Sequence, residues 1–237
     1  MPAPGEIVER ALGYPFPRPR TSVVIEGVSV REPVEADLAD RTAVLAYGSN
    51  ASPESLGWKF PDERHVVVPL VRGTMRDVDV VYSSHIAVYG SVPATLQGSP
   101  GTEAETFVAF LTGAQLELVA SWEINANYEE LEIDLELELG EPPPSVGAFV
   151  SRHGCLTAGG AEVAVAEVPA RERRFAAMTQ PEVLEHVRAS VAPDLDLDDF
   201  ILGNVNDYDR ARGYTAELRR SARPFERGRS RRGDSNP

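Results

Sequence analysis

Four residues, Tyr-Gly-Ser-Asn at 47–50, form the first stretch of this sequence that could bind a ligand. They follow an apolar run that ends at Ala46, and they precede Ser52 and Pro53, which have the character of a helix N-cap and a first helical residue. A turn of small polar residues between a strand and a helix leaves backbone N–H groups free, and such groups bind anions. Because many strand–helix connections have this composition, the motif predicts an anion-binding loop only if other residues support it.

Glu123 stands apart from the other carboxylates of the chain. Many of the 37 acidic residues lie in solvated patterns, such as the strict alternation of acidic and apolar residues from 130 to 139. Glu123 instead shares one face of a predicted helix with Leu116, Val119 and Ala120. Two interpretations stay open: the helix end frays and Glu123 faces water, or its carboxylate is partly desolvated and suited to general acid–base catalysis.

Other catalytic chemistries find less support in the sequence. Cys155 is the only cysteine, and none of the four histidines is spaced as a metal ligand, so no metal site is expected; the histidines are at 65, 85, 153 and 186. The chain has no glycine-rich phosphate-binding loop and no Gly-x-Ser-x-Gly motif. Ser49 could act as a nucleophile, but the sequence does not identify the histidine base that it would need.

Three motifs in a fixed order carry a resemblance to a known family. Tyr47-Gly48-Ser49-Asn50 comes first, PATLQGSPG follows at 93–101, and TFVAFLTGAQLELVASWEINANYEELEIDL at 106–135 places Glu123 before Tyr128. In this order they resemble the γ-glutamyl cyclotransferase family over about residues 42–140, and more loosely over the C-terminal helices. The resemblance implies that Glu123 is the catalytic residue. It also implies that the substrate is bound by Tyr47, Gly48, Ser49, Asn50 and Tyr128.

The family resemblance also implies a reaction. The substrate's own α-amine attacks its γ-glutamyl carbonyl, which gives 5-oxoproline and a free amine or amino acid, with Glu123 carrying the proton. Ser49 is then a binding residue, the only partner required is a small γ-glutamyl compound, and no metal or organic cofactor takes part. Glu123 must therefore lie within roughly 6 Å of the 48–50 loop, because one bound glutamyl group has to reach both.

Three residues depart from the family pattern, and alternatives follow from them. Ala51 stands where a bulky apolar residue is usual, and Trp122 and Ile124 flank Glu123 in place of the family's usual neighbours. One alternative is a catalytically silent module that binds a small molecule or a partner protein on the same fold. Another is an enzyme that removes a γ-glutamyl group from a biosynthetic intermediate. The leaving amine and the oligomeric state are not predicted by the sequence.

Predicted helices and strands must position these residues. Their number and order indicate an α+β protein, with a compact mixed β-sheet or small β-barrel and flanking helices. Helices are expected from the capping-box pair Thr112 and Gln115 to Glu123, and near 181–192 and 206–220. A short strand or a hairpin is expected at 22–30. Strands are expected at 42–48, 64–73, 77–85, 106–112, 128–139, 146–154 and 161–169, with a turn between 73 and 77 and a loop over 97–105.

The same patterns divide the chain into four segments. We expect an N-terminal lead segment at 1–40, irregular over its first 20 residues, and a cyclotransferase-like barrel domain at 41–170. A helical extension at 171–222 packs on that domain, and an arginine-rich, disordered tail occupies 223–237.

Composition limits the partners and the compartment. The net charge is −14, yet the last 19 residues carry +5, so the preceding 218 residues carry −19 and are poorly suited to nucleic acid. No stretch has the ~18 uninterrupted apolar residues of a membrane span, and the first 20 residues have no secretory-signal core. With a single cysteine, these features favour a cytoplasmic protein without a membrane partner.

Overall fold

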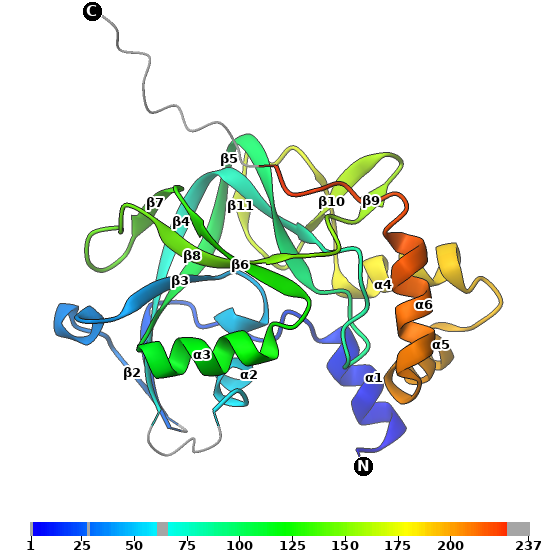
Figure 1. The fold of residues 1–237 in the computed structure, drawn as a ribbon, viewed down its shortest axis with the longest axis horizontal. Coiled ribbons are helices and arrows are strands. Elements are labelled where there is room, and N and C mark those ends of the chain that lie inside the picture. Colours follow the sequence, from blue (N-terminus) through cyan, green and yellow to red (C-terminus); the bar gives the residue numbers. More distant parts are fainter. Residues whose placement is uncertain (1, 28, 61–65, 227–237) are drawn as a thin grey trace, which may run out of the picture.

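A computed structural model describes residues 2–27, 29–60 and 66–226, and in it an open, mixed β-sheet is flanked by helices (Figure 1). The main path of the sheet runs β12-β10-β4-β5-β3-β8-β6, and within the described residues β6 does not pair back with β12. The α+β class and the mixed sheet are therefore confirmed, whereas the alternative of a closed barrel is wrong for the described part of the chain. The strands are β1 (Val23–Glu26), β2 (Ser29–Arg31), β3 (Thr42–Ala46), β4 (Val67–Tyr82), β5 (Ala94–Leu111), β6 (Ala126–Leu131), β7 (Asp134–Leu137), β8 (Val146–Ser151), β9 (Thr157–Ala158), β10 (Ala161–Val165), β11 (Ala170–Arg171) and β12 (Ala176–Met178).

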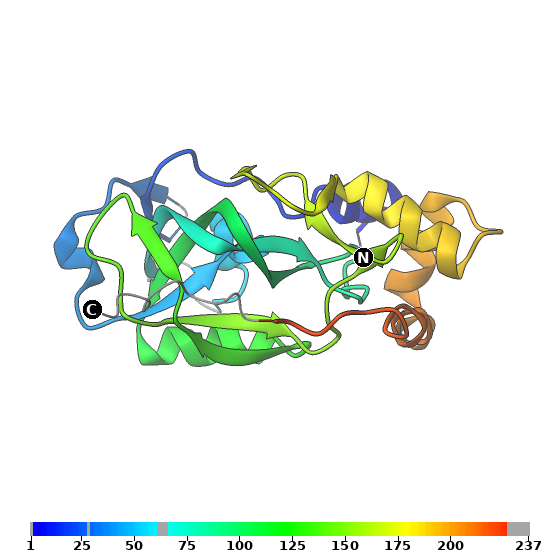
Figure 2. The same ribbon diagram turned by 90° about the horizontal axis from the view of Figure 1, so that it is seen from above.

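Helices gather at two places beside the sheet (Figures 1 and 2). One group lies at one end of the sheet and shares a core cluster with it through residues such as Ala11, Val183 and Phe200. The helix that carries Glu123 lies instead along one face, where Val119 packs in a second core cluster. The helices are α1 (Pro4–Leu12), α2 (Pro53–Gly57), α3 (Gly113–Trp122), α4 (Gln180–Val191), α5 (Leu197–Asn206) and α6 (Tyr208–Leu218), with 3₁₀ turns at Glu35–Leu38 and Ser49–Ala51.

The two long strands β4 and β5 form the centre of the sheet as an antiparallel pair. The predicted turn after Gly73 and the predicted loop over 97–105 are wrong, because both stretches lie inside these strands. The turn-forming residues instead make an irregularity in the pairing between Arg76 and Val78. There the backbone of Asp77 has φ 61°, and its carboxylate accepts the N–H of Gly101 at 2.7 Å.

The acidic alternating stretch is divided between two strands. The single strand predicted at 128–139 is wrong, because β6 pairs with β8 while β7 pairs with β4, and the chain turns from one partner to the other between them. The predicted alternation of faces is confirmed: Leu131 and Leu135 are buried, and the acidic residues between them are exposed. Side-chain alternation follows the extended backbone whichever strand is its partner, so the pattern fixes the faces and not the pairing.

Both ends of the described chain are packed against the rest. The first 20 residues were expected to be irregular, yet they contain α1, whose Ala11 is fully buried. Part of the expected disordered tail is also ordered: Arg223 and Cys155 exchange backbone hydrogen bonds, and Glu226 bonds to Gln97 and Gly98. The remaining tail residues, 227–237, lie outside the described residues, as does the start of the strand expected at 64–73.

Helix boundaries were predicted better than strand boundaries. The side chains of Thr112 and Ser52 accept their predicted capping hydrogen bonds, from the N–H groups of Gln115 and Ser55. The helix expected near 181–192 is α4, whereas the one expected at 206–220 is the shorter α6, and α5 was not predicted. These local signals succeed because a cap and its partner lie only three residues apart.

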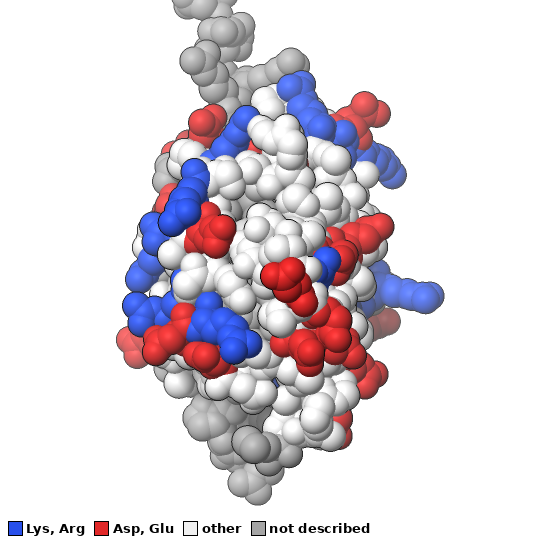
Figure 3. Space-filling view, turned by 90° about the vertical axis from the view of Figure 1, so that its right-hand side faces the viewer, with Lys and Arg blue, Asp and Glu red and all other residues white. Residues whose placement is uncertain are grey.

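On the surface at the helical end, acidic and basic side chains are interspersed with uncharged ones (Figure 3). This face therefore lacks the continuous basic surface that phosphate binding requires. Among the described residues, the longest apolar helix is still too short to cross a bilayer.

Candidate functional site

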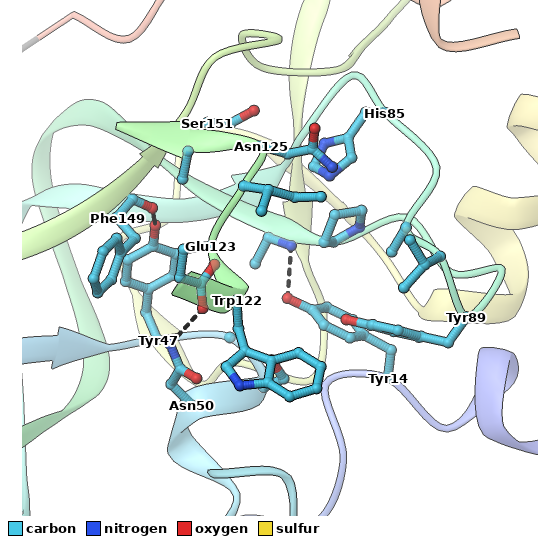
Figure 4. A pocket seen from close by; sticks show the side chains of 18 of the residues that line it. Tyr14, Tyr47, Asn50, His85, Tyr89, Trp122, Glu123, Asn125, Phe149 and Ser151 are labelled. Atoms are coloured by element: carbon cyan, nitrogen blue, oxygen red, sulfur yellow. Dashed lines mark hydrogen bonds between the residues drawn. The ribbon is translucent and has the colours of Figure 1, made fainter. Parts of the chain in front are cut away.

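A cavity of about 350 Å³ lies where the end of β3, the 83–94 connection and the α3–β6 connection meet. Figure 4 shows Tyr14 and Tyr89 on one side of this cavity and Tyr47 and Glu123 across from them. The predicted site residues Tyr47, Gly48, Ser49, Asn50 and Glu123 all line it. The cavity thus joins residues that are more than 70 positions apart in the sequence (Asn50 and Glu123).

Glu123 sits at the C-cap of α3 and reaches the loop that the motif predicted. The Nδ2 of Asn50 donates to its Oε1 at 3.0 Å, and the Glu123 side chain is 24% exposed. The expected proximity of Glu123 to the 48–50 loop is therefore confirmed. The interpretation in which the helix end frays and Glu123 turns to water is wrong, because α3 ends in ordered hydrogen bonds: the Glu123 N–H donates to Ala120 and its carbonyl accepts from Ala126.

Lys59 is a second partner of Glu123. Its Nζ lies 2.5 Å from the same oxygen, Oε1, and its side chain is only 11% exposed. The carbonyl of Lys59 also accepts the indole N–H of Trp122 at 3.2 Å, so the chain following α2 holds the end of α3 at two adjacent residues. Among the described residues, no partner contacts the other carboxylate oxygen, Oε2.

Gly48 of the motif has no room for a side chain, because Tyr14 from the N-terminal segment packs against it. A Cβ at Gly48 would lie 2.5 Å from the hydroxyl oxygen of Tyr14. That hydroxyl accepts the backbone N–H of Ala94 at 2.7 Å, so Tyr14 is fixed against the loop. Burial raises the pKa of Tyr14 well above its ordinary value, which keeps the phenol protonated and able to donate.

Two further tyrosines form the walls of the cavity. The hydroxyl of Tyr47 donates to the carbonyl of Phe149 on β8, which ties the motif to the neighbouring strand, and burial raises the pKa of Tyr47. Burial, followed by the negative charge of Glu123, raises the pKa of Tyr89 to about 12. All three phenols around the cavity are therefore neutral hydrogen-bonding groups near pH 7.

The opposite end of the cavity holds a polar cluster around two histidines. The rings of His85 and His153 are 4.7 Å apart, and the Nδ1 of His85 is 2.7 Å from the hydroxyl of Ser83. Burial, with His153 as a minor cause, lowers the pKa of His85 to about 3, and burial also lowers the pKa of His153. Both rings are neutral near pH 7. Ser83 is fully buried and does not line the cavity, so the Ser83–His85 pair is not a catalytic dyad.

Tyr128 does not belong to the site. Its ring packs edge-on against Phe149, and its hydroxyl donates to Glu130 at 2.8 Å on the exposed side of β6. The ring crosses over Gly147 on β8, where a Cβ would meet the Tyr128 hydroxyl at 2.2 Å. Tyr128 pairs with Phe149 and shares its face of the sheet, but its side chain leans along the strands toward Gly147 and Glu130 and does not line the cavity. The prediction that Tyr128 binds substrate is therefore wrong for this geometry.

Several lining residues were missed by sequence reasoning. Tyr14 lies in a segment expected to be irregular, and Asn125 and Trp122 adjoin Glu123 without any motif of their own. Lys59 offered a signal, because it is the only lysine in the sequence. A single lysine among 22 arginines sets that position apart, and its ammonium group is found on Glu123.

Two other chemistries find no support at this site. Ser49 has no histidine partner among the described residues, which leaves it without the base that a serine nucleophile needs. The part of the chain that the structure describes also contains no cluster of three metal-ligating side chains. The site can position a carboxylate beside hydrogen-bond donors, which is acid–base chemistry.

Comparisons with known proteins do not extend this assignment. A scan against protein-family models finds none that matches the chain, and a search of curated proteins finds no match. The function must be argued from the geometry of the cavity.

Proposed function

We propose that this protein is a γ-glutamyl cyclotransferase-type enzyme, which converts a γ-glutamyl amide into 5-oxoproline and a free amine. One observation supports the proposal above the others: Asn50 of the Tyr-Gly-Ser-Asn loop holds Glu123 at the wall of a cavity of about 350 Å³. The residues that the family resemblance implied to be catalytic and substrate-binding, apart from Tyr128, thus line one cavity.

Glu123 is suited to carry protons in this reaction because its two oxygens have different environments. Asn50 and Lys59 both bind Oε1, which fixes the carboxylate, and Oε2 has no partner among the described residues. Oε2 takes a proton from the α-ammonium group of the substrate, so that the amine nitrogen can attack the γ-carbonyl carbon. The C–N bond to the leaving group then breaks as the leaving nitrogen takes up the proton that Oε2 carried. The ring nitrogen gives up its remaining extra proton to Oε2, which releases it to solvent, so that the products are neutral lactam and free amine.

The loop at 48–50 supplies donors for the glutamyl group. The backbone N–H groups of Ser49 and Asn50 open a 3₁₀ turn, and neither donates to an acceptor among the described residues. Donors placed in this way stabilise the oxyanion that forms when the carbonyl is attacked. Because amine and carbonyl belong to one molecule, holding the glutamyl chain in a folded conformer supplies much of the rate.

The proposal is tested by incubating the protein with a panel of γ-glutamyl amines, amino acids and peptides in water enriched in ¹⁸O. Cyclisation releases 5-oxoproline without ¹⁸O, because water takes no part, whereas hydrolysis releases glutamate that carries one ¹⁸O atom. We expect unlabelled 5-oxoproline in the mass spectrum for at least one compound. Labelled glutamate would replace the proposal with a hydrolase, and no product with any compound would favour a catalytically silent binding module.

A further inference from the structure

The end of the cavity around His85 is built in a way that glutamyl cyclisation does not require. His85 is 7% exposed, yet it lines the cavity, and its Nε2 has no hydrogen-bond partner among the described residues. In Figure 4, Glu123 lies between Asn50 on one side and His85 and Asn125 on the other. A glutamyl group held at the 48–50 loop therefore directs its leaving group past Glu123 toward His85 and Asn125.

A chain of hydrogen bonds supplies one donor to this end of the cavity. Ser151 Oγ accepts the N–H of His153 at 3.0 Å and lies 2.6 Å from Ser83 Oγ, which is 2.7 Å from His85 Nδ1. If each hydroxyl donates onward, from Ser151 to Ser83 and from Ser83 to Nδ1, the hydrogen left without an acceptor is the one on His85 Nε2. In the reverse direction, the hydrogen left over is that of the Ser151 hydroxyl. Because His85 and Ser151 both line the cavity, the network presents one donor to this end of the cavity in either direction.

Asn125 offers a second donor at the same place. Its Oδ1 lies 3.2 Å from the Nε2 of His153, and because a carbonyl oxygen can only accept, His153 donates there. The amide group of Asn125 is thereby oriented with its NH₂ free, since no acceptor for Nδ2 is found among the described residues. Asn125 and the His85–Ser83–Ser151 network thus each present an uncharged donor to this end of the cavity.

The remaining walls near this end are apolar or uncharged. Among the described lining residues, Glu123 is the one carboxylate, and none is a lysine or an arginine. The rim of the cavity carries exposed apolar side chains: Trp122 is 60% exposed, Ile124 57% and Val88 60%. The positive charges of Arg152 and Arg219 act on His153, but neither residue lines the cavity. A leaving group at this end therefore contacts an apolar rim and neutral donors, and no cation among the described lining residues.

We propose that the leaving group is an uncharged amine with an apolar body and one hydrogen-bond acceptor, such as a carbonyl oxygen, that binds between Asn125 Nδ2 and the donor of the His85–Ser83–Ser151 network. The substrates are then γ-glutamyl amides of such amines, and γ-glutamyl α-amino acids are poor substrates. This inference rests on the proposed cyclotransferase function. A leaving group with a free carboxylate would be desolvated without a cation, which a neutral acceptor avoids.

Three compounds with one aromatic body test the inference on the parent protein: γ-glutamyl-phenylalaninamide, γ-glutamyl-phenylalanine and γ-glutamyl-phenethylamide. They end respectively in a neutral acceptor, a carboxylate and no acceptor. We expect kcat/KM for 5-oxoproline release to be at least about tenfold higher for the phenylalaninamide than for the acid. It should be about 5–30-fold higher than for the phenethylamide, which is the usual worth of one or two neutral hydrogen bonds.

Variants then test the residues. His85→Phe keeps an aromatic ring and breaks the network, and Asn125→Leu removes the second donor. Each should reduce the preference for the phenylalaninamide over the phenethylamide by about fivefold, the usual worth of one neutral hydrogen bond. His186→Phe, on α4 and outside the cavity, is the matched control and should keep the parent's ratio.

The outcomes separate this inference from the function on which it rests. If γ-glutamyl-phenylalanine releases 5-oxoproline with a kcat/KM equal to or higher than that of γ-glutamyl-phenylalaninamide, the inference is overturned and the cyclotransferase function still stands. No 5-oxoproline from the three compounds or from the wider panel would overturn both. If His85→Phe does not fold, the ratios measured on the parent protein still decide the question.

Discussion

Gly48 and Tyr14 form a contact whose energy can be measured with a double-mutant cycle. A Cβ at residue 48 would lie 2.5 Å from the Tyr14 hydroxyl oxygen, whereas the ring carbon that bears the hydroxyl is 3.7 Å away, an ordinary contact. Gly48→Ala should therefore overpack the parent protein, at a cost of about 1–3 kcal/mol in unfolding free energy. In a Tyr14→Phe background, the clashing oxygen is gone and the same substitution should cost much less.

The magnitude of the single Tyr14→Phe change follows from its one hydrogen bond. The Tyr14 hydroxyl accepts the Ala94 N–H at 2.7 Å, so the Phe variant leaves that donor without a partner and loses about 1–3 kcal/mol. Costs of Gly48→Ala that do not involve the hydroxyl are the same in both backgrounds and cancel in the cycle. We expect a coupling energy of about 1–2 kcal/mol, with the double variant more stable than the sum of the single effects predicts.

The assay is urea unfolding followed by tryptophan fluorescence, with the parent, two single variants and the double variant measured under one set of conditions. A coupling energy within about 0.3 kcal/mol of zero would show that Tyr14 does not pack on the loop. It would also remove the N-terminal segment from the description of the site. Equal slopes for the four proteins are the control that the compared unfolded states are alike.

Three further changes have expected outcomes. The folded-state pKa of His85, about 3, lies below its unfolded value near 6.5, so the unfolded chain binds a proton that the folded chain does not. The unfolding free energy should therefore fall by up to about 1.4 kcal/mol per pH unit as pH decreases below 6.5, and His85→Asn should make the decrease between pH 6.5 and 5 shallower. Removing residues 223–237 should cost about 3–5 kcal/mol relative to removing 227–237 alone, because seven hydrogen bonds and a packed aromatic ring are lost, and the melting temperatures of the two truncations measure this difference. Lys59→Met leaves Glu123 with Asn50 as its one described partner and should lower the unfolding free energy by about 1–2 kcal/mol, whereas an unchanged value would show that the ion pair is not formed.

Signals that act within a few residues predicted this fold well. The caps at Ser52 and Thr112 and the alternation from 130 to 139 are local, and the structure contains all three. The loop over 97–105 was mispredicted because Gly and Pro usually break strands, and here pairing with β4 outweighs that preference. Strand pairing is set by partners distant in sequence, which no local pattern specifies.

The candidate site was predicted in part, for the same reason as the fold: residues in local motifs were found, and residues that only folding brings together were not. Glu123 and residues 47–50 were found because they lie in motifs, and their contact follows once α3 packs beside β3 and the following loop. Tyr14 reaches the cavity from the N-terminal segment, far from both motifs in the sequence. The prolines around it form no pattern that predicts a site residue. Tyr128 was misplaced because a motif gives order along the chain and not which way a side chain leans along its strand.

The most direct measurement is the rate of 5-oxoproline formation by Glu123→Gln on a substrate that the parent protein converts. Glutamine keeps the size and the contact with Asn50 but cannot accept a proton, so kcat should fall by about 10²–10⁴-fold while KM changes little. Because Lys59 loses its counter-charge, the variant's melting temperature must be recorded to establish that it is folded at the assay temperature. Glu132→Gln, on the exposed face, is the matched control and should keep the parent's kcat. A folded Glu123→Gln protein with kcat within about threefold of the parent would contradict the assignment of Glu123 as the proton carrier.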